Sequence, residues 1–276
     1  MTEERAVLVT GATGGIGTAT VRLLRRRGFT VYAGARGRAE FEPGVRVLPL
    51  DVTDPDSVAA AAKRVAGEVD GLWAVVNSAG VIVQGPLELV PADEWRRQVE
   101  VNTLGPATVI REFLPLIRAG HGRIVNVSAA TGRVAMPLLG ALSASKAGLE
   151  ALSNALRLEL AAWRIPVVVI EPGTTETEIF ARARAAADAA LQQADRERVG
   201  LYQGHLAAYE KAMGRFKPGP VDKVADVIVR AVEARRPRRR YAVAEARTLG
   251  AILPKLPPAL RDSLLATSLG LNHLNP

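Results

Sequence analysis

The chain of 276 residues contains no cysteine, which excludes disulfide bonds, a thiolate nucleophile and a thiolate metal site. Its three histidines are scattered along the sequence, so we expect no metal centre. No apolar run reaches the roughly 18 residues that a membrane span requires. The first ten letters, MTEERAVLVT, are typical of neither a signal peptide nor a transit peptide. These absences favour a soluble, cytoplasmic protein without metal.

Aromatic residues are also scarce, at 4% of the chain. The formal net charge of +8 permits a nucleic-acid partner, and the densest basic cluster is ARRPRRRY at residues 234–241. A base-stacking surface needs aromatic side chains among the basic ones, and Tyr241 alone stands beside this cluster. A solvated helix end leading into a strand explains the same letters, so we expect no nucleic-acid partner.

What the chain does have is a regular alternation of short apolar runs and helix-length segments. The runs lie at residues 6–10, 30–35, 45–50, 72–77, 123–128, 166–171 and 240–244, and the helical periodicity at 16–27, 55–69, 93–119 and 140–163. Asp54 is placed to cap the second helix, and Gly28 and Gly71 stand where helices would stop. Continuous apolar strands that alternate with helices indicate a mostly parallel sheet buried on both faces. We predict one doubly wound, seven-stranded α/β domain over residues 1–276.

Two segments depart from this alternation. Residues 174–217 are rich in helix formers and contain Phe180, Tyr209 and Phe216. Ligands in doubly wound sheets bind at the carboxyl ends of the strands, so we expect a small helical lobe there that binds substrate. Ordinary helix packing without a ligand is the alternative. Residues 245–276 form an amphipathic tail that could cap the lobe, pack in an oligomer or touch a membrane surface; its prolines and mixed charge favour packing.

Directly after the first apolar run comes TGATGGIG, residues 10–17, with glycine at positions 11, 15 and 17. Glycine permits a tight turn and lets a pyrophosphate approach the backbone closely. The N-terminus of the following helix offers unpaired amide groups to the same phosphates. Between a strand and a helix, this spacing predicts a dinucleotide-binding loop.

The loop and the motifs after it resemble those of the short-chain dehydrogenase/reductase family over roughly residues 5–180. Asp51 and Val52 are similar to the family's aspartate and hydrophobic residue that hold the adenine, and NSAG at 77–80 resembles its Asn-Asn-Ala-Gly segment. SASK, which ends at Lys146, and PGTTET at 172–177 follow in family order. The resemblance implies a Rossmann-type fold and a nicotinamide cofactor held by Gly11, Thr13, Gly15, Ile16, Gly17, Asp51, Val52, Asn77, Ala79, Gly80, Lys146, Pro172, Gly173, Thr175 and Thr177.

The residues after the second apolar run bear on which cofactor binds. A carboxylate at this point would bond the ribose hydroxyls of NAD and repel the extra phosphate of NADP. The chain has Ala35 there, followed by Arg36 and Arg38. A guanidinium suits a phosphate through bidentate, charge-assisted hydrogen bonds. We therefore predict NADP(H), bound through Arg36; the alternative is that these arginines only solubilise the loop.

The resemblance also implies which side chains are missing. Ketone reductases of the family use a tyrosine that protonates the alkoxide, a lysine that lowers the pKa of that tyrosine, a serine that polarises the carbonyl, and an asparagine. Aligned on Lys146, the tyrosine position is Leu142 and the serine position is Ala129. Lys146 and Asn102 remain, and we assign them the catalytic positions.

Neighbouring hydroxyls are poor replacements. Ser128 should face the opposite side of its strand from Ala129, and Ser143 is rotated by about 100° from Leu142 on a helix. Other sources of a proton are water held by Lys146 and Asn102, the substrate itself, or residues in and beside the lobe, namely Glu176, Glu178, Tyr202, His205 and Tyr209.

Three functions are compatible with these residues. The first is an atypical NADP(H)-dependent oxidoreductase of the family, acting on a bulky hydrophobic substrate that is polyketide- or steroid-like, since the tail resembles those of hydroxysteroid and retinol dehydrogenase-like members. The second is a non-redox cyclase, isomerase or lyase that uses an apolar pocket beside the cofactor. The third is an NADP-binding pseudoenzyme. The resemblance further implies a homodimer or homotetramer joined through the helices at 93–119 and 140–163.

Overall fold

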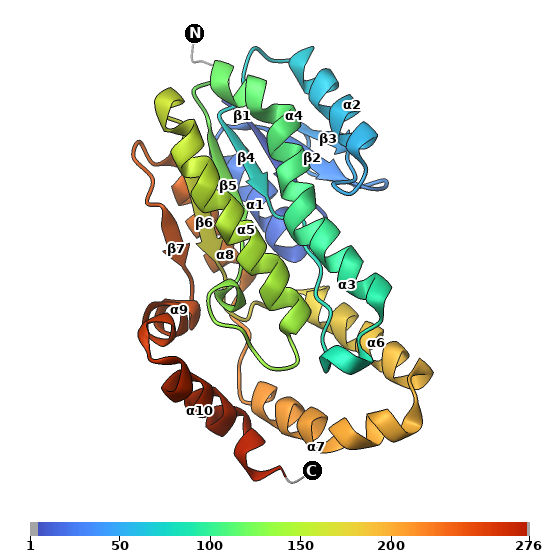
Figure 1. The fold of residues 1–276 in the computed structure, drawn as a ribbon. Coiled ribbons are helices and arrows are strands. Elements are labelled where there is room, and N and C mark those ends of the chain that lie inside the picture. The colour runs from blue at the N-terminus through green and yellow to red at the C-terminus, as the bar shows by residue number, and fades with distance from the viewer. Residues whose placement is uncertain (1–4, 275–276) are drawn as a thin grey trace.

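The fold is a single seven-stranded parallel sheet between two layers of helices, seen in a computed structural model that describes residues 5–274 (Figure 1). The sheet order is β3-β2-β1-β4-β5-β6-β7, and every neighbouring pair is parallel. This confirms the predicted doubly wound α/β architecture. The strands are β1 (Ala6–Thr10), β2 (Thr30–Ala35), β3 (Val45–Pro49), β4 (Ala74–Asn77), β5 (Arg123–Val127), β6 (Val167–Glu171) and β7 (Arg240–Ala242).

Two apolar clusters, one on each face of the sheet, hold the helices in place. One unites Val58, Phe113 and Leu160 with the strands, and the other unites Leu24 and Ile228 with them. Every residue of β1, β4, β5 and β6 is buried, which is why these strands read as continuous apolar runs. The flanking helices are α1 (Gly15–Arg26), α2 (Pro55–Ala66), α3 (Ala92–Val99), α4 (Gly105–Ala119), α5 (Gly140–Glu159) and α8 (Val221–Glu233).

The helix boundaries confirm some sequence signals and correct others. Asp54 caps α2 by accepting a hydrogen bond from the Asp56 amide, and Gly28 follows α1 with φ +79°. The prediction that a helix stops at Gly71 is wrong, because α2 ends at Ala66. A Cβ on Gly71 would lie 2.6 Å from the Gly120 Cα, so that glycine serves a close backbone approach.

The segment predicted as one helix over 93–119 is divided. A π-helical stretch, Glu100–Leu104, separates α3 from α4 and contains Asn102. Such a bulge adds a residue to one turn and changes the direction of the side chains around it. Asn102 is fully buried at this point.

Residues 174–217 contain the helices α6 (Glu178–Gln193) and α7 (Arg196–Met213). The chain enters and leaves this lobe through one paired neck: the Glu176 amide donates to the Gly219 carbonyl at 2.9 Å, and the Gly219 amide donates to the Thr174 carbonyl at 2.8 Å. The C-terminal segment forms α9 (Ala246–Ile252) and α10 (Pro258–Leu269), and α10 contacts α7 (Figure 1).

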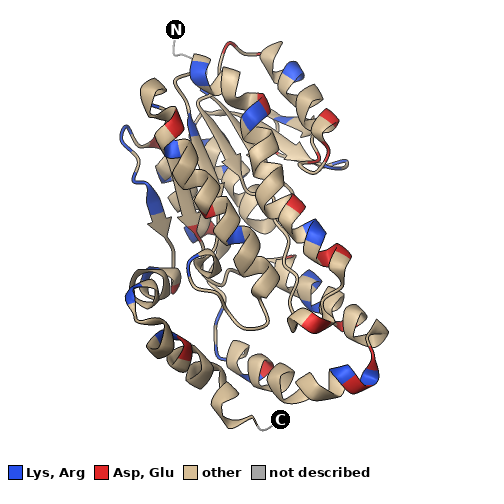
Figure 2. Ribbon diagram, viewed as in Figure 1, with Lys and Arg blue, Asp and Glu red and all other residues tan. Residues whose placement is uncertain are grey.

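Charge is spread over most of the surface, with lysine and arginine concentrated on the loop that precedes β7 (Figure 2). Arg235, Arg236, Arg238 and Arg239 are exposed there, whereas Arg240 turns inward. Among residues 5–274, no helix combines the length and apolar character needed to cross a membrane. The same residues contain no cluster of side chains suited to hold a metal ion.

Candidate cofactor and active site

The glycine loop forms a tight turn between β1 and α1 that no larger side chain fits. Gly11 has φ +61°, and a Cβ on it would lie 2.6 Å from the Ala79 Cα. A Cβ on Gly17 would lie 2.9 Å from the Ala12 Cα. The first residues of α1 have no side-chain cap, so their amide groups are free to bind phosphate oxygens.

A cavity of about 1500 Å³ extends from this loop across the carboxyl ends of the strands to the lobe. Most of the predicted cofactor-binding residues line it: Gly11, Thr13, Gly15, Ile16, Gly17, Arg36, Asp51, Val52, Ala79, Gly80, Thr175 and Thr177. Arg38 is not part of the lining. The cavity therefore brings together motifs that are separated by more than a hundred residues of sequence.

The other four predicted cofactor residues do not line the cavity, and these are Asn77, Lys146, Pro172 and Gly173. The Asn77 Nδ2 donates to the Asn126 Oδ1 at 2.8 Å, which joins the ends of β4 and β5. The NSAG segment is held on β1 by the Thr10 Oγ1, which accepts hydrogen bonds from the amides of Ser78 and Ala79 at 3.1 and 3.2 Å.

One buried polar group without a partner, on Thr177, fits a bound dinucleotide. The Thr177 Oγ1 is buried and has no hydrogen-bond partner within the described residues, although Thr177 lines the cavity. A Cβ on Gly15 would lie 2.8 Å from the Thr177 Cγ2, so the loop and the neck of the lobe are in contact. A buried hydroxyl without a partner is costly, and a ligand atom beside it removes the cost.

Lys146 and Asn102 converge on Gly80 from α5 and from the π-helical stretch. A Cβ on Gly80 would lie 3.4 Å from the Asn102 Oδ1 and 3.7 Å from the Lys146 Nζ. The Asn102 side chain accepts from the Val81 amide and donates to the Val81 carbonyl, each at 2.9 Å. Asn102 therefore fixes the backbone that follows NSAG.

Lys146 is 7% exposed, and its Nζ donates to the Val127 carbonyl at 2.8 Å. Burial lowers the pKa of Lys146 to about 8, against the opposing effect of the Glu150 carboxylate. At neutral pH the ammonium form still predominates, but it is a stronger acid than an ordinary lysine.

Hydrocarbon side chains stand at positions 129 and 142. Leu142 lies on α5 one turn before Lys146 and is 6% exposed, and Ala129 directly follows Ser128 after the end of β5. The Ser128 hydroxyl donates to the Glu150 Oε1 at 3.1 Å, and the Ser143 hydroxyl accepts from the Met136 amide at 3.3 Å. Both serines are thus engaged elsewhere.

The lobe residues named as sources of a proton separate into two groups. Glu176, Glu178 and Tyr209 line the cavity, whereas Tyr202 and His205 do not. The Tyr202 hydroxyl donates to the Glu88 Oε2 at 3.1 Å. Burial raises the pKa of Tyr209 to about 12, which makes its phenol a weaker acid than usual.

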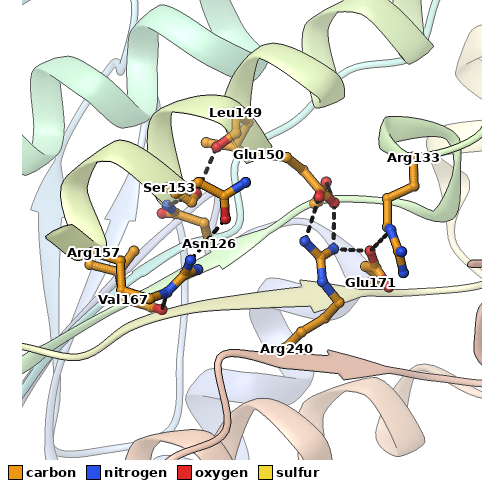
Figure 3. A network of polar contacts seen from close by, with 11 residues as sticks. Asn126, Arg133, Leu149, Glu150, Ser153, Arg157, Val167, Glu171 and Arg240 are labelled. Atoms are coloured by element: carbon orange, nitrogen blue, oxygen red, sulfur yellow. Dashed lines mark hydrogen bonds and ion pairs between the residues drawn. The ribbon is translucent and has the colours of Figure 1, made fainter. Parts of the chain in front are cut away.

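Sequence reasoning missed a buried ionic network behind the site (Figure 3). Arg240 makes two bonds to the Glu150 carboxylate, at 2.9 and 2.7 Å, and also pairs with the Glu171 Oε1. Arg133 lies 4.0 Å from the same Glu171 oxygen. Burial raises the pKa of Glu171 to about 7, although the charge of Arg240 opposes the shift. The one signal in the sequence was a glutamate at the end of an apolar strand.

Sequence reasoning also missed Thr131, two residues after Ala129. Its Oγ1 is buried and lacks a hydrogen-bond partner in the described part of the chain.

The sheet, the glycine loop and the cavity together define a dinucleotide-binding α/β protein. Residues 5–188 match the family model described as short chain dehydrogenase. The chain belongs to the short-chain dehydrogenase family.

Several relatives are similar over much of the chain. Retinol dehydrogenase 16 of Mus musculus is 33% identical over 280 residues, which cover 95% of this chain and 88% of that protein. The NADPH-dependent 3-dehydrocapnine reductase of Ornithobacterium rhinotracheale is 32% identical, over 87% of this chain and 88% of that enzyme. Estradiol 17-beta-dehydrogenase 2 of Mus musculus is 39% identical over 191 residues. That match covers 64% of this chain and only 50% of the length of the relative.

A solved structure extends the likeness to the whole fold. The short chain dehydrogenase of Burkholderia cenocepacia J2315, in complex with NADP, has a TM-score of 0.74 and 26% identity, covering 99% of both chains.

Proposed function

We propose that this protein is an NADP(H)-dependent oxidoreductase of its family that acts on a bulky hydrophobic substrate without the usual serine and tyrosine hydroxyls. The observation that carries the proposal is one continuous cavity, which runs from the glycine loop and Arg36 to apolar side chains of the lobe. When bound, the nicotinamide group supplies or accepts a hydride. The residues of the chain bind that group, enclose the substrate and handle the proton.

The choice of NADP(H) rests on the end of β2. Arg36 is exposed on the cavity wall directly after the buried Ala35, and no carboxylate stands at position 35. The Asp51 Oδ1 is already occupied, because it accepts from the Thr53 amide at 2.9 Å and from its hydroxyl at 2.7 Å. A phosphate on the ribose therefore meets a guanidinium and no competing charge at position 35. The names of the Burkholderia and Ornithobacterium relatives mention NADP and NADPH, which supports the same choice.

The substrate class follows from the far wall of the cavity. Apolar side chains from α6, from α7 and the residues after it, and from the loop before α5 line this wall, namely Leu138, Phe180, Leu191, Leu206, Met213 and Phe216. Apolar walls with few polar groups select ligands by shape and burial of hydrocarbon. We assign a steroid-like or polyketide-like substrate to this chain, and the names of the retinol and estradiol relatives support that class.

For reduction of a carbonyl, we assign the proton to Lys146. With a bound nicotinamide supplying the hydride for the new C–H bond, the alkoxide left on the substrate would take a proton that a water molecule relays from the Lys146 ammonium. Lys146 then recovers a proton from solvent. With a pKa of about 8, its ammonium is protonated at pH 7 yet gives up its proton more readily than an ordinary lysine.

A non-redox reaction is the second proposal, and Leu142 favours it. Leu142 is buried on α5 one turn before Lys146, and hydrocarbon at that position suits a pocket that folds a substrate for cyclisation, isomerisation or elimination. In that case product forms without net oxidation of NADPH. Binding of NADPH without turnover of any substrate would indicate the third function, a pseudoenzyme.

The experiment measures dissociation constants for NADPH and NADH by fluorescence titration, followed by stopped-flow absorbance of the nicotinamide with steroid and polyketide ketones. We expect tighter binding of NADPH than NADH. Arg36→Ala should weaken NADPH binding about tenfold or more, since a hydrogen bond to a charged group contributes about 1.5–3 kcal/mol. Arg38→Ala, the matched control outside the cavity, should change neither constant. Tighter binding of NADH by the wild type would contradict the assignment.

We further propose a homodimer or homotetramer joined through residues 93–119 and 140–163, which include α4 and α5, and a cytoplasmic location. Leu158 on α5 is 79% exposed, and Leu104 just before α4 and Trp163 just after α5 are exposed too, which supports a covering partner. Sedimentation velocity with Leu158→Asp tests this: the variant should sediment as a smaller species than the wild type.

A further inference from the structure

The side chain of Glu245, from the C-terminal part of the chain, binds the turn at Gly173 and Thr174 that follows β6. The Glu245 carboxylate accepts a hydrogen bond from the Thr174 amide. A Cβ on Gly173 would lie 2.5 Å from the Glu245 Cδ and 2.7 Å from its Oε1. Glycine at position 173 is therefore what allows the carboxylate to reach the backbone.

Other contacts engage the carbonyls of Gly173 and Thr174, but not the Thr174 amide. The Thr175 hydroxyl donates to the Gly173 carbonyl at 2.9 Å, and the Gly219 amide donates to the Thr174 carbonyl at 2.8 Å. Glu245 is the partner that the structure shows for the Thr174 amide. Loss of its carboxylate would leave that amide without an acceptor, which costs free energy wherever water does not replace it.

The segment that carries Glu245 is itself firmly held. Arg240 begins β7 and is fixed by the two carboxylates of the ionic network, Glu150 on α5 and Glu171 at the end of β6 (Figure 3). β7 pairs with β6 along three residues, and Ala244 then takes φ +55°, which turns the chain toward α9. This left-handed residue places Glu245 over the turn.

We propose that Glu245 is a positioning residue of the cofactor site, which holds the Gly173–Thr174 turn in the shape that binds NADP(H). The inference rests on the proposed cofactor site. Thr174 and Thr175 line the cavity, so a shift of their backbone reaches the ligand directly. Residue 245 lies outside the matched range 5–188, which means that the contribution comes from a part of the chain that the family model does not cover.

The contact between Gly173 and Glu245 permits a test by paired substitutions. The variants are Gly173→Ala, Glu245→Ala, Glu245→Gln and the double variant Gly173→Ala/Glu245→Ala. Thr248→Ala, on the exposed side of α9, is the matched control. Two quantities are measured for each: the dissociation constant of NADPH by fluorescence titration, and the unfolding temperature of the protein without ligand.

Glu245→Ala and Gly173→Ala should each weaken NADPH binding about tenfold, the effect of losing or displacing one charge-assisted hydrogen bond. Glu245→Gln keeps an acceptor oxygen and should retain most of the affinity. The double variant should bind NADPH more tightly than Gly173→Ala alone, because the clash is gone.

Two results would overturn the proposal. In the first, Gly173→Ala weakens NADPH binding by the same factor whether residue 245 is glutamate or alanine. In the second, the Glu245 variants unfold at a lower temperature but bind NADPH as the wild type does. Failure of the wild type to bind NADPH at all would instead contradict the proposed cofactor site.

Discussion

The proposed function predicts that hydroxyls introduced at positions 142 and 129 convert this chain into an ordinary ketone reductase. The perturbation is the double variant Leu142→Tyr/Ala129→Ser. Leu142 lies four residues before Lys146 on α5, and side chains at that spacing are neighbours on one face of a helix. A tyrosine at position 142 would place its hydroxyl near the buried ammonium of Lys146, whose positive charge lowers the pKa of a phenol.

The expected gain is large compared with the expected damage. A positioned general acid contributes about 10²–10⁴-fold to a rate, and a donor to the developing oxyanion about 10²–10³-fold. Even partial placement of both groups should therefore raise kcat/KM by at least about 10². Because Leu142 is only 6% exposed, the larger ring should cost about 1–3 kcal/mol of stability through overpacking.

The assay follows loss of nicotinamide absorbance with a panel of unactivated ketones at saturating NADPH. Leu142→Phe is the matched control, since it adds the ring without the hydroxyl and should show no gain. The reasoning would be refuted if the double variant binds NADPH with the wild-type dissociation constant, remains folded, and still reduces ketones no faster than Leu142→Phe.

Four further outcomes are expected. Asp54→Ala should lower the free energy of unfolding in urea by about 1 kcal/mol through loss of the α2 cap, and an unchanged midpoint would contradict the cap. Gly17→Ala should abolish NADPH binding in a titration, whereas Gly200→Ala on α7, where a Cβ meets nothing within 4 Å, should not. The rate of carbonyl reduction should fall as pH rises through about 8, where Lys146 loses its proton, and a flat profile would exclude it as the donor. Because the pKa of Glu171 is raised to about 7, ionisation of this group lowers the stability of the folded protein as pH rises toward that value. The unfolding temperature of Glu171→Gln, minus that of the wild type, should therefore increase between pH 5 and 8.

Most of the sheet could be predicted because its strands are buried on both faces. β1, β5 and β6 read as unbroken apolar runs, and the glycine loop is a local signal set between a strand and a helix. The end of α2 was misplaced because glycine stands both at position 67, which caps the helix, and at position 71. Only the close approach of Gly71 to Gly120 explains the second glycine.

The contacts that shape the site could not be predicted, because they join residues far apart in sequence. Arg240 and Glu171 are 69 residues apart, and Glu245 and Thr174 are 71 apart. The sequence of residues 234–241 suggested a basic surface. No feature of the neighbouring sequence distinguished Arg240, which turns inward, from the exposed arginines beside it. The identity of Lys146 was visible in the sequence, but its burial, and hence its lowered pKa, depends on the fold.

The most direct test of the account is a crystal structure of this protein with NADP bound. We predict the ribose phosphate against Arg36 and, facing the reactive carbon of the nicotinamide, the side chains of Leu142 and Ala129 with the Lys146 ammonium as the nearest proton donor. Two results would contradict the account. One is a serine or tyrosine oxygen within hydrogen-bond distance of the space that the substrate carbonyl would occupy over the reactive carbon. The other is a ribose phosphate that points away from Arg36.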